Sequence, residues 1–394
     1  MDSSLLFPCD WIFNEPNHLF ESGYKSDQVQ LDLTNSPASL MLWSLVQSHS
    51  VVNPLSADCQ NVIALGQSVK LTVAQIAQLK AAQCCGVLGV TCVDSKADII
   101  DWNALNLNGT IGNKLSKLTI TQLWMQNNNL RGSISSFPST IQYFSLENND
   151  FTGKLPALPN FYEAYLGNNQ FSGKIPALPN TAMYFYVANN KLSGQIPDLP
   201  AYLQYLDLQS NNLKGGLPVL PSIMVDLILA NNQLKGTLDN LPSTLQTLNL
   251  ATNSFHGELP ALPAGLITLN VYNNDFCGEV GTVPSGIRIL NLYNNLFVGD
   301  LTVQKPVQLV ANINGFTSVN VVDQGQMTVC DVSNNPIWRE TLAPLEGNCA
   351  VYGTKKRRDP FLVKRSVDAQ VVASANNGIY GVVMGMFATV AALL

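Results

Sequence analysis

The sequence predicts an α/β solenoid, in which short repeats stack in a row and share one parallel β-sheet. The first observation is a period, because asparagine recurs with a step of 21 residues, once 20. The second is a fixed pattern around each asparagine, as in Leu206-x-Leu208-x-x-Asn211-x-Leu213-x-Gly215. A fixed period with a fixed pattern indicates stacked identical units. The asparagines are Asn128, Asn149, Asn169, Asn190, Asn211, Asn232, Asn253, Asn274 and Asn295.

The segment before each asparagine predicts a strand, because apolar and polar residues alternate there. We expect Leu206 and Leu208 to point into a continuous core and the strands to form the concave sheet. The Asn211 amide has one acceptor and two donors, which can pair with backbone groups at the turn that follows. The glycine two residues after the next leucine permits a tight backbone.

A second period lies between the strands, where prolines recur in the frame Leu-Pro-x-Leu-Pro or a close variant. Proline fixes φ and removes a hydrogen-bond donor, so the return path of each repeat is not a long helix. We expect short extended or 3-10 segments on the convex side. The prolines are Pro159, Pro179, Pro200, Pro221, Pro242, Pro263 and Pro284.

The ends of the stack carry degraded repeats, at residues 100–109, 309–316 and 332–337. The pattern indicates about a dozen units between residues 99 and 350, and atypical terminal units are what an open stack requires as caps. Cys330 and Cys349 flank the final asparagine unit and are interpreted as a disulfide of the C-terminal cap.

The consensus LxxLxLxxNxLxGxLP, as in residues 203–218, resembles plant-type leucine-rich repeats, and the doubled proline resembles bacterial LPX-type repeats. The flanking Cys59, Cys84-Cys85 and Gly-Val-Leu-Gly-Val-Thr-Cys92 resemble the N-terminal cap of receptor-like proteins and polygalacturonase inhibitors. Leu88 stands where those caps usually carry tryptophan. The resemblance implies disulfides Cys59–Cys84 and Cys85–Cys92, and a fold that serves binding without naming a ligand.

The amino-acid composition of the chain limits the kinds of partner that it can bind. Charged residues make up 12% of the chain and the net charge is −6, so no basic face is available for nucleic acid. Eight cysteines, six of them assigned to caps, indicate an oxidising compartment. The spacing of Cys84, Cys85 and Cys92 does not suit a metal, and we expect neither a metal nor a cofactor. Catalytic motifs are absent from the sequence, so we expect no enzyme and no catalytic residue.

The segments outside the repeats give the domain boundaries. Residues 1–57 are an N-terminal extension, or a signal peptide that starts at Met41, and residues 58–98 form the cysteine-containing cap. Residues 99–350 hold the repeats and the C-terminal cap, and 351–378 form a linker. Residues 379–394 are an apolar tail. Ser374-Ala375-Asn376 before the tail resembles a GPI-attachment signal, with a membrane-spanning helix as the alternative. Asn108-Gly109-Thr110 is an N-glycosylation sequon.

Candidate binding residues lie two, four and six positions before each asparagine, because these positions point outward when the leucines point inward. Tyrosines and carboxylates concentrate there in the earlier repeats, and Lys, Arg and His are absent from these positions. The alternative is that tyrosine is simply a good strand former that packs on its neighbours. The candidates are Trp124, Tyr143, Glu147, Glu163, Tyr165, Tyr184, Tyr186, Tyr205, Asp207 and Asp226.

The combined prediction is an extracellular or cell-surface protein, attached to a membrane through its tail or a GPI anchor. We expect its concave face to bind a protein, a peptide or a carbohydrate. One alternative is a structural protein of a cell wall or surface without a specific ligand. The other is an inhibitor of a secreted hydrolase.

Overall fold

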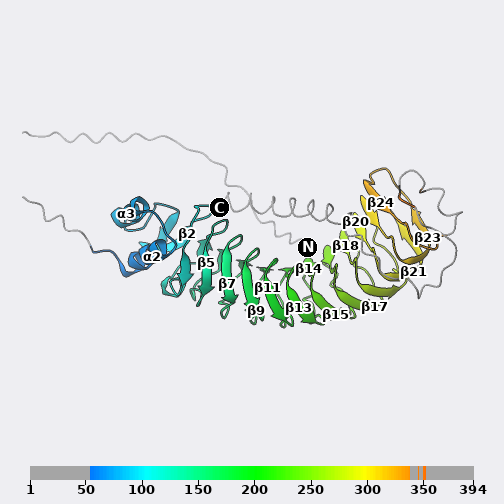
Figure 1. The fold of residues 1–394 in the computed structure, drawn as a ribbon, viewed down its shortest axis with the longest axis horizontal. Coiled ribbons are helices and arrows are strands. Elements are labelled where there is room, and N and C mark those ends of the chain that lie inside the picture. Colours follow the sequence, from blue (N-terminus) through cyan, green and yellow to red (C-terminus); the bar gives the residue numbers. More distant parts are fainter. Residues whose placement is uncertain (1–53, 338–344, 346–348, 352–394) are drawn as a thin grey trace, which may run out of the picture. The chain divides into compact units, whose positions relative to one another are not determined.

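The computed structural model describes residues 54–337, 345 and 349–351. From Leu55 onward the described chain forms one compact unit, in which the repeats follow one another in a row (Figure 1). The predictions for the N-terminal extension or signal peptide, for most of the linker and for the apolar tail concern residues outside this range.

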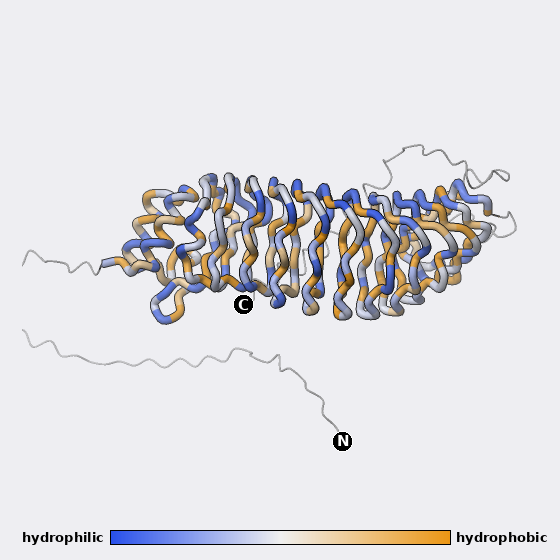
Figure 2. Tube along the Cα trace, turned by 90° about the horizontal axis from the view of Figure 1, so that it is seen from below, coloured by the Kyte–Doolittle hydropathy of each residue, from blue (hydrophilic) through white to orange (hydrophobic). Residues whose placement is uncertain are grey.

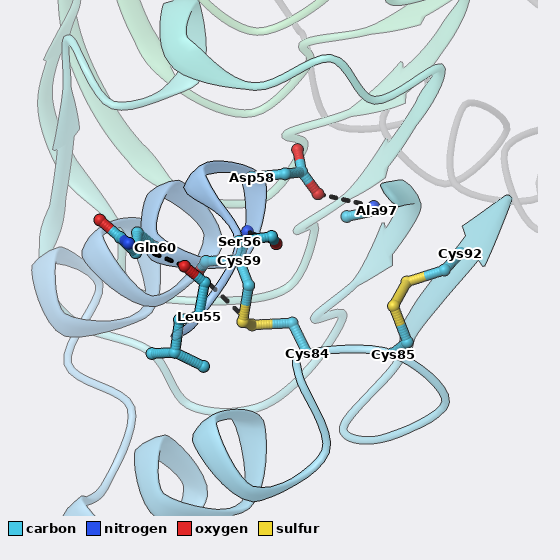
Figure 3. Close-up of a disulfide and its surroundings, with 9 residues drawn as sticks. All are labelled: Leu55, Ser56, Asp58, Cys59, Gln60, Cys84, Cys85, Cys92 and Ala97. Carbon is cyan, nitrogen blue, oxygen red and sulfur yellow. Dashed lines mark hydrogen bonds between the residues drawn. A yellow bond between two sulfur atoms is a disulfide. The ribbon is translucent and has the colours of Figure 1, made fainter. Parts of the chain in front are cut away.

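The N-terminal cap consists of two short helices and a strand pair. Helix α2 spans Ala57–Ser68, and the Ser56 hydroxyl caps it by accepting the N–H of Cys59 at 3.1 Å. Helix α3 spans Val73–Ala81 and begins with a capping box, in which Thr72 and Gln75 bond each other's backbone N–H groups. The Asp58 carboxylate ties α2 to the sheet by accepting the Ala97 N–H at 2.7 Å (Figure 3).

The first sheet is the expected concave sheet. It has 13 strands among the described residues, and the strands after β2 follow one another in parallel. Strand β1 pairs antiparallel with β2 and closes the N-terminal edge. Its strands are β1 Val90–Val93, β2 Lys96–Asp101, β4 Gln122–Trp124, β6 Tyr143–Ser145, β8 Glu163–Tyr165, β10 Tyr184–Tyr186, β12 Tyr205–Asp207, β14 Asp226–Ile228, β16 Thr247–Asn249, β18 Thr268–Asn270, β20 Ile289–Asn291, β22 Gln308–Val310 and β24 Val329–Asp331.

A second parallel sheet, of 11 strands among the described residues, was not expected from the sequence. It forms from the residues around the Leu-x-Gly part of each repeat, where the extended backbone finds the next repeat's backbone within pairing distance. Its strands are β3 Thr110–Gly112, β5 Arg131–Ile134, β7 Asp150–Lys154, β9 Gln170–Gly173, β11 Lys191–Gly194, β13 Asn212–Gly215, β15 Gln233–Gly236, β17 Ser254–Gly257, β19 Asp275–Gly278, β21 Leu296–Val303 and β23 Gly315–Val321.

The proline-containing return segments, such as residues 195–204, carry neither a helix nor a strand. This confirms the expected extended path, and a 3-10 turn, η1 at Leu115–Lys117, lies in the first repeats. Figure 2 shows hydrophobic and hydrophilic residues alternating within each turn of the stack. The single core runs between the two sheets along the whole row.

The repeated asparagine holds each turn to the previous one. The Asn211 amide nitrogen donates to the carbonyl oxygens of Leu208 at 3.0 Å, Gln209 at 3.1 Å and Val187 of the previous repeat at 3.0 Å. Its Oδ1 accepts the N–H of Leu192 at 2.9 Å. Asn211 is 7% exposed, so these backbone groups have little access to water. The predicted pairing of the asparagine column with backbone is confirmed.

The core position that follows each asparagine changes its residue type along the stack. Phe151 stacks on Phe171 with ring centroids 6.0 Å apart, and Phe255, Phe276, Phe297 and Phe316 continue as stacked pairs. Between these two groups the same position holds Leu192, Leu213 and Leu234, each fully buried. The column thus begins with Leu130, and its three central leucines lie between a group of two phenylalanines and a group of four.

We predict that Asn211→Ala lowers the free energy of unfolding by about 1–3 kcal/mol, because the Leu192 N–H and three carbonyl groups lose a buried partner. Asn212→Ala is the matched control, since Asn212 is exposed in β13, and a change within about 0.5 kcal/mol is expected there. Urea denaturation of both variants measures the difference. Equal losses would contradict the role assigned to the asparagine column.

The three disulfides that were predicted are present: Cys59–Cys84, Cys85–Cys92 and Cys330–Cys349. They lie in the two caps, and Figure 3 shows the two disulfides of the N-terminal cap. Cys277 is a free, half-buried thiol. Cys59 and Cys84 are each 1% exposed and belong to the core. The bridge thus joins α2 to the loop after α3 within packed apolar surroundings.

Removing the first bridge by Cys59→Ser with Cys84→Ser is expected to cost about 2–4 kcal/mol of stability, because the unfolded chain gains freedom and two hydroxyls enter the core. Cys277→Ser serves as control and should change stability by no more than about 0.5 kcal/mol. Thermal unfolding of the two variants, with peptide mapping under non-reducing conditions, checks both statements. Free thiols at the six bridge positions of the folded parent would refute the assignment.

Candidate ligand-binding face

Each three-residue strand of the first sheet points its middle side chain inward and the other two outward. Leu206 in β12 is 1% exposed and Phe185 in β10 is 0% exposed, whereas Tyr184, Tyr186 and Tyr205 beside them are half-buried. The predicted inward and outward assignment is therefore confirmed on these strands. Strand pairing aligns the outward residues into columns, so that Tyr184 lies between Glu163 and Tyr205.

Four tyrosines form two ring stacks on neighbouring columns. The rings of Tyr165 and Tyr186 are parallel within 6° with centroids 5.0 Å apart. The rings of Tyr184 and Tyr205 are parallel within 11° at 4.4 Å. Tyr205 lies in the column of Tyr184, not in that of Tyr165 and Tyr186. The result is a platform two rings wide across β8, β10 and β12.

Carboxyl groups border this platform. The Tyr165 hydroxyl donates to Glu163 Oε2 at 2.8 Å. Tyr143 lies one strand away and packs on Tyr162, with centroids 5.6 Å apart. Tyr162, which was not among the predicted binding residues, precedes its strand and is 37% exposed. Its only signal was its place directly before an outward glutamate.

Asp207 and Glu147 are the most perturbed acids of this face. Asp207 is 7% exposed, and its Oδ1 accepts the Gln209 N–H at 3.0 Å. Burial raises the pKa of Asp207 to about 7, against the lowering effect of the Gln209 bond, and the charges of Glu147 and Asp226 add to the rise. Burial alone raises the pKa of Glu147 to about 7. Burial also raises the pKa of Asp226.

Small residues make room for the Glu147 carboxyl. A Cβ added to Gly167, on the neighbouring strand, would lie 3.1 Å from Glu147 Oε1 and 3.4 Å from the Ala188 carbonyl oxygen. The glycine therefore leaves a hollow that the carboxylate enters. Asp207 was expected to stand free on the surface, but it lies within this half-buried group of acids. Its register partners on the neighbouring strands are Tyr186 and Ile228.

Two other parts of the face differ from this region. Trp124 is half-buried at the N-terminal end, and its Nε1 donates to Gln122 Oε1 at 3.4 Å, two strands away from the tyrosine stacks. Tyr272 and Tyr293 are 6% and 9% exposed and pack with Ala230 and Ala251 in a small apolar cluster. At these positions the tyrosine rings fill space in the cluster and do not form an open stack. The open stacks occur only on β8, β10 and β12, as far as the described strands of this sheet show.

We therefore define the aromatic–acidic patch by the outward residues of β6 to β14. The described residues contain no group of His, Cys, Asp and Glu arranged to hold a metal ion. The patch has no Lys, Arg or His in its columns, so its carboxyls face no cation of the same sheet. Its members are Tyr143, Glu147, Glu163, Tyr165, Tyr184, Tyr186, Tyr205, Asp207 and Asp226.

Comparison with known proteins finds leucine-rich repeats over part of the chain. The family model described as Leucine Rich Repeat matches residues 202–222. The protein STRUBBELIG-RECEPTOR FAMILY 3 of Arabidopsis thaliana is 43% identical over 70 residues, which is 17% of this chain and 9% of that protein. Over these regions the chain is similar to leucine-rich repeat proteins of plants. The short aligned region means that the whole relative's activity does not transfer with the match.

Solved structures share the fold of this leucine-rich repeat chain. The ectodomain of the receptor kinase GASSHO1/SCHENGEN3 from Arabidopsis thaliana, in complex with CASPARIAN STRIP INTEGRITY FACTOR 2, aligns with a TM-score of 0.53 at 20% identity. The alignment covers 75% of this chain and 47% of the ectodomain, so the chain spans less than half of that length. A plant ice-binding protein aligns with a TM-score of 0.50 at 19% identity, over 62% of this chain and 88% of that one.

The raised pKa values predict that stability falls as pH rises. The unfolded carboxyls ionise near pH 4, whereas the folded Asp207 and Glu147 hold their protons to about pH 7. Their contribution is complete below about pH 4 and is lost as pH rises towards about 7. Asp207→Asn removes one of these acids, so the variant should exceed the parent by about 1–3 kcal/mol at pH 8 and match it at pH 4.

The substitution is mild because other repeats carry asparagine at this position. Asn249 and Asn291 accept the N–H two residues ahead through Oδ1, at 3.3 and 3.2 Å, as Asp207 does. Denaturation of parent and variant at both pH values measures the effect. A variant that loses stability at pH 8 would show that the Asp207 carboxylate is stabilised by the fold.

Proposed function

We propose that this protein is a non-enzymatic extracellular binding protein that takes a peptide or protein ligand on the aromatic–acidic patch. The observation that carries the proposal is the pair of half-hidden acids, Glu147 and Asp207, beside open tyrosine stacks. A buried carboxylate without a cationic partner is costly to ionise, and both pKa values are raised accordingly. A ligand cation placed there would offset that cost.

The ligand chemistry follows from the same side chains. Lysine or arginine of a basic peptide can pair with the carboxylates in charge-assisted hydrogen bonds. A cation over a tyrosine face gains further attraction from the ring quadrupole, and the stacks present such faces on Tyr165, Tyr186, Tyr184 and Tyr205. Tyrosine also contributes a rigid contact area at low entropic cost. The patch thus suits an extended segment with basic and apolar side chains.

The extracellular assignment rests on the caps. Three disulfides persist in oxidising compartments, and the exposed Asn108 of the sequon is accessible to glycosylation. Among the helices of the described residues, none has both the length and the apolar character needed to cross a bilayer. Attachment through the apolar tail or a GPI anchor therefore stays a prediction about residues outside the described range.

The fold agrees with a binding role without naming the ligand. The GASSHO1/SCHENGEN3 ectodomain was solved with a bound partner, which is a property of that receptor. At 20% identity the likeness extends to the fold alone. We extend ligand binding to this chain on its own patch, and we rank it above a purely structural role because Asp207 and Glu147 weaken the folded state at neutral pH.

The test is an array of peptides and glycans probed with the full chain, followed by affinity measurements on the ligand found. Tyr165→Ala with Tyr186→Ala should weaken binding at least about tenfold, because truncating an interface tyrosine commonly costs 1 kcal/mol or more. Tyr202→Ala is the matched control, since Tyr202 is 66% exposed in a return segment outside the patch. That variant should bind as the parent does.

The variant Asp207→Asn adds a second test to the same experiment. We expect it to weaken binding of a basic peptide while it raises stability at pH 8, a combination that marks a functional group rather than a structural one. If the array selects glycans alone, the ligand is a sugar chain that lies on the same tyrosine rings. If the double tyrosine variant stays folded and binds as tightly as the parent, the patch is not the binding site.

A further inference from the structure

The second sheet carries a column of side chains that sit on the glycines of the next repeat. A Cβ added to Gly173 would lie 3.0 Å from Lys154 Cγ, and one added to Gly278 would lie 2.8 Å from Glu258 Cγ. Each glycine thus leaves space for a side chain of the preceding repeat. That side chain belongs to the residue directly after the preceding repeat's own glycine, as Lys154 follows Gly153 and lies against Gly173. We call these residues the seat column: Ser133, Lys154, Lys174, Gln195, Gly216, Thr237, Glu258 and Glu279.

The charges of the seat column are opposite on the two sides of Gly216. Lys174 lies two repeats before Gly216 and Glu258 lies two repeats after it. Lys154 and Glu279 occupy the positions three repeats before and after. The neutral Gln195 and Thr237 stand next to the centre. The aliphatic carbons of each charged side chain lie along a glycine of the next repeat. The charged groups are therefore held in a row on the outer side of the sheet.

We propose that the outer face of the second sheet is the interface of an antiparallel homodimer. Its two-fold axis runs along β13 at Gly216 and reverses the order of repeats. This operation brings Lys174 to Glu258 of the partner subunit, and Lys154 to Glu279 of the partner subunit. Symmetry repeats both contacts, so the interface is isologous and closes at two chains. The surface lies apart from the aromatic–acidic patch and does not depend on its ligand.

A second copy fits this face better than other occupants. The four charged residues form no ion pair with the described residues of their own chain, where the recorded ion pair joins Lys305 to Asp323. Lys174 and Glu258 are four strands apart, about 19 Å, so they cannot meet within one chain. A polyanion that follows the lysines would meet the glutamates farther along the same column. Gly216 at the centre has no side chain to keep the two backbones apart.

The geometry predicts a weak dimer. Nine strands, β5 to β21, make a strip about 43 Å long and about 13 Å wide, or on the order of 550 Å² per partner, below a standard interface. The same operation sets Asp150 against Asp275 of the partner subunit, and Lys214 against Lys214 of the partner subunit. These like charges reduce the affinity further. Association should therefore be salt-sensitive and seen at high protein concentration.

Sedimentation equilibrium of the full chain at low and high salt tests the proposal. The parent should dimerise at low salt and dissociate at high salt. Lys154→Glu with Lys174→Glu should raise the dimer dissociation constant at least about tenfold, and so should Glu258→Lys with Glu279→Lys. Mixing the two variants should restore a dimer, because all four charged contacts of the seat column between them are then of opposite sign. Circular dichroism confirms that each variant is folded.

Lys214→Ser separates a second copy from an anionic polymer. It removes the like-charge contact at the axis, so it should tighten the dimer, whereas it would weaken binding of a polyanion such as heparin. A parent that stays monomeric at every concentration and salt tested overturns the proposal. The proposal is also overturned if the two charge variants remain monomeric when they are mixed. Binding of heparin that is lost with Lys154→Glu and Lys174→Glu, without any dimer, assigns the face to a polyanion instead.

Discussion

The buried asparagine amide is the interaction on which the stack depends. A short repeat turns sharply after its strand, and that turn leaves backbone N–H and C=O groups inside the protein. Asn211 satisfies such groups in two repeats at once, by donating to three carbonyls and accepting the Leu192 N–H. Because the amide bonds the previous repeat as well as its own, the period along the chain becomes a fixed step in space.

That fixed step determines where functional side chains can gather. Residues at equivalent positions of successive repeats become neighbours, so two tyrosines 21 residues apart, such as Tyr165 and Tyr186 or Tyr184 and Tyr205, meet as stacked rings. The same rule builds the seat column on the other sheet. The core leaves these outward positions free to vary, and in the earlier repeats aromatic and acidic residues occupy the first sheet while lysines occupy the second. One scaffold thus displays two surfaces of different chemistry.

The sequence was sufficient for features that depend on period and alternation. The inward leucines and the asparagine column follow from patterns within single repeats. The N-terminal disulfides, for example Cys59–Cys84, were implied by the resemblance of the flanking segment to plant-type caps. The second sheet escaped prediction because Leu-x-Gly is too short to show alternation. The burial of Asp207 escaped as well, because it depends on the neighbouring strands, where its register partners are Tyr186 and Ile228. The hollow for Glu147 depends on Gly167 in the next repeat, and such cross-repeat effects leave no local signal.

The change of residue type in the core column bears on how the stack comes apart. In a linear array each repeat is stabilised mainly by its two neighbours, so cohesion varies from junction to junction. Leu192, Leu213 and Leu234 bury less apolar surface than the phenylalanines on either side, so this column contributes less cohesion between the two phenylalanine groups than within them. We therefore expect two stiffer blocks, around Phe151 and Phe171 and from Phe255 to Phe316, joined by a softer segment. The tyrosine platform of β8 to β12 lies where the first block meets this segment, so an occupant of that platform would also act as a splint across it.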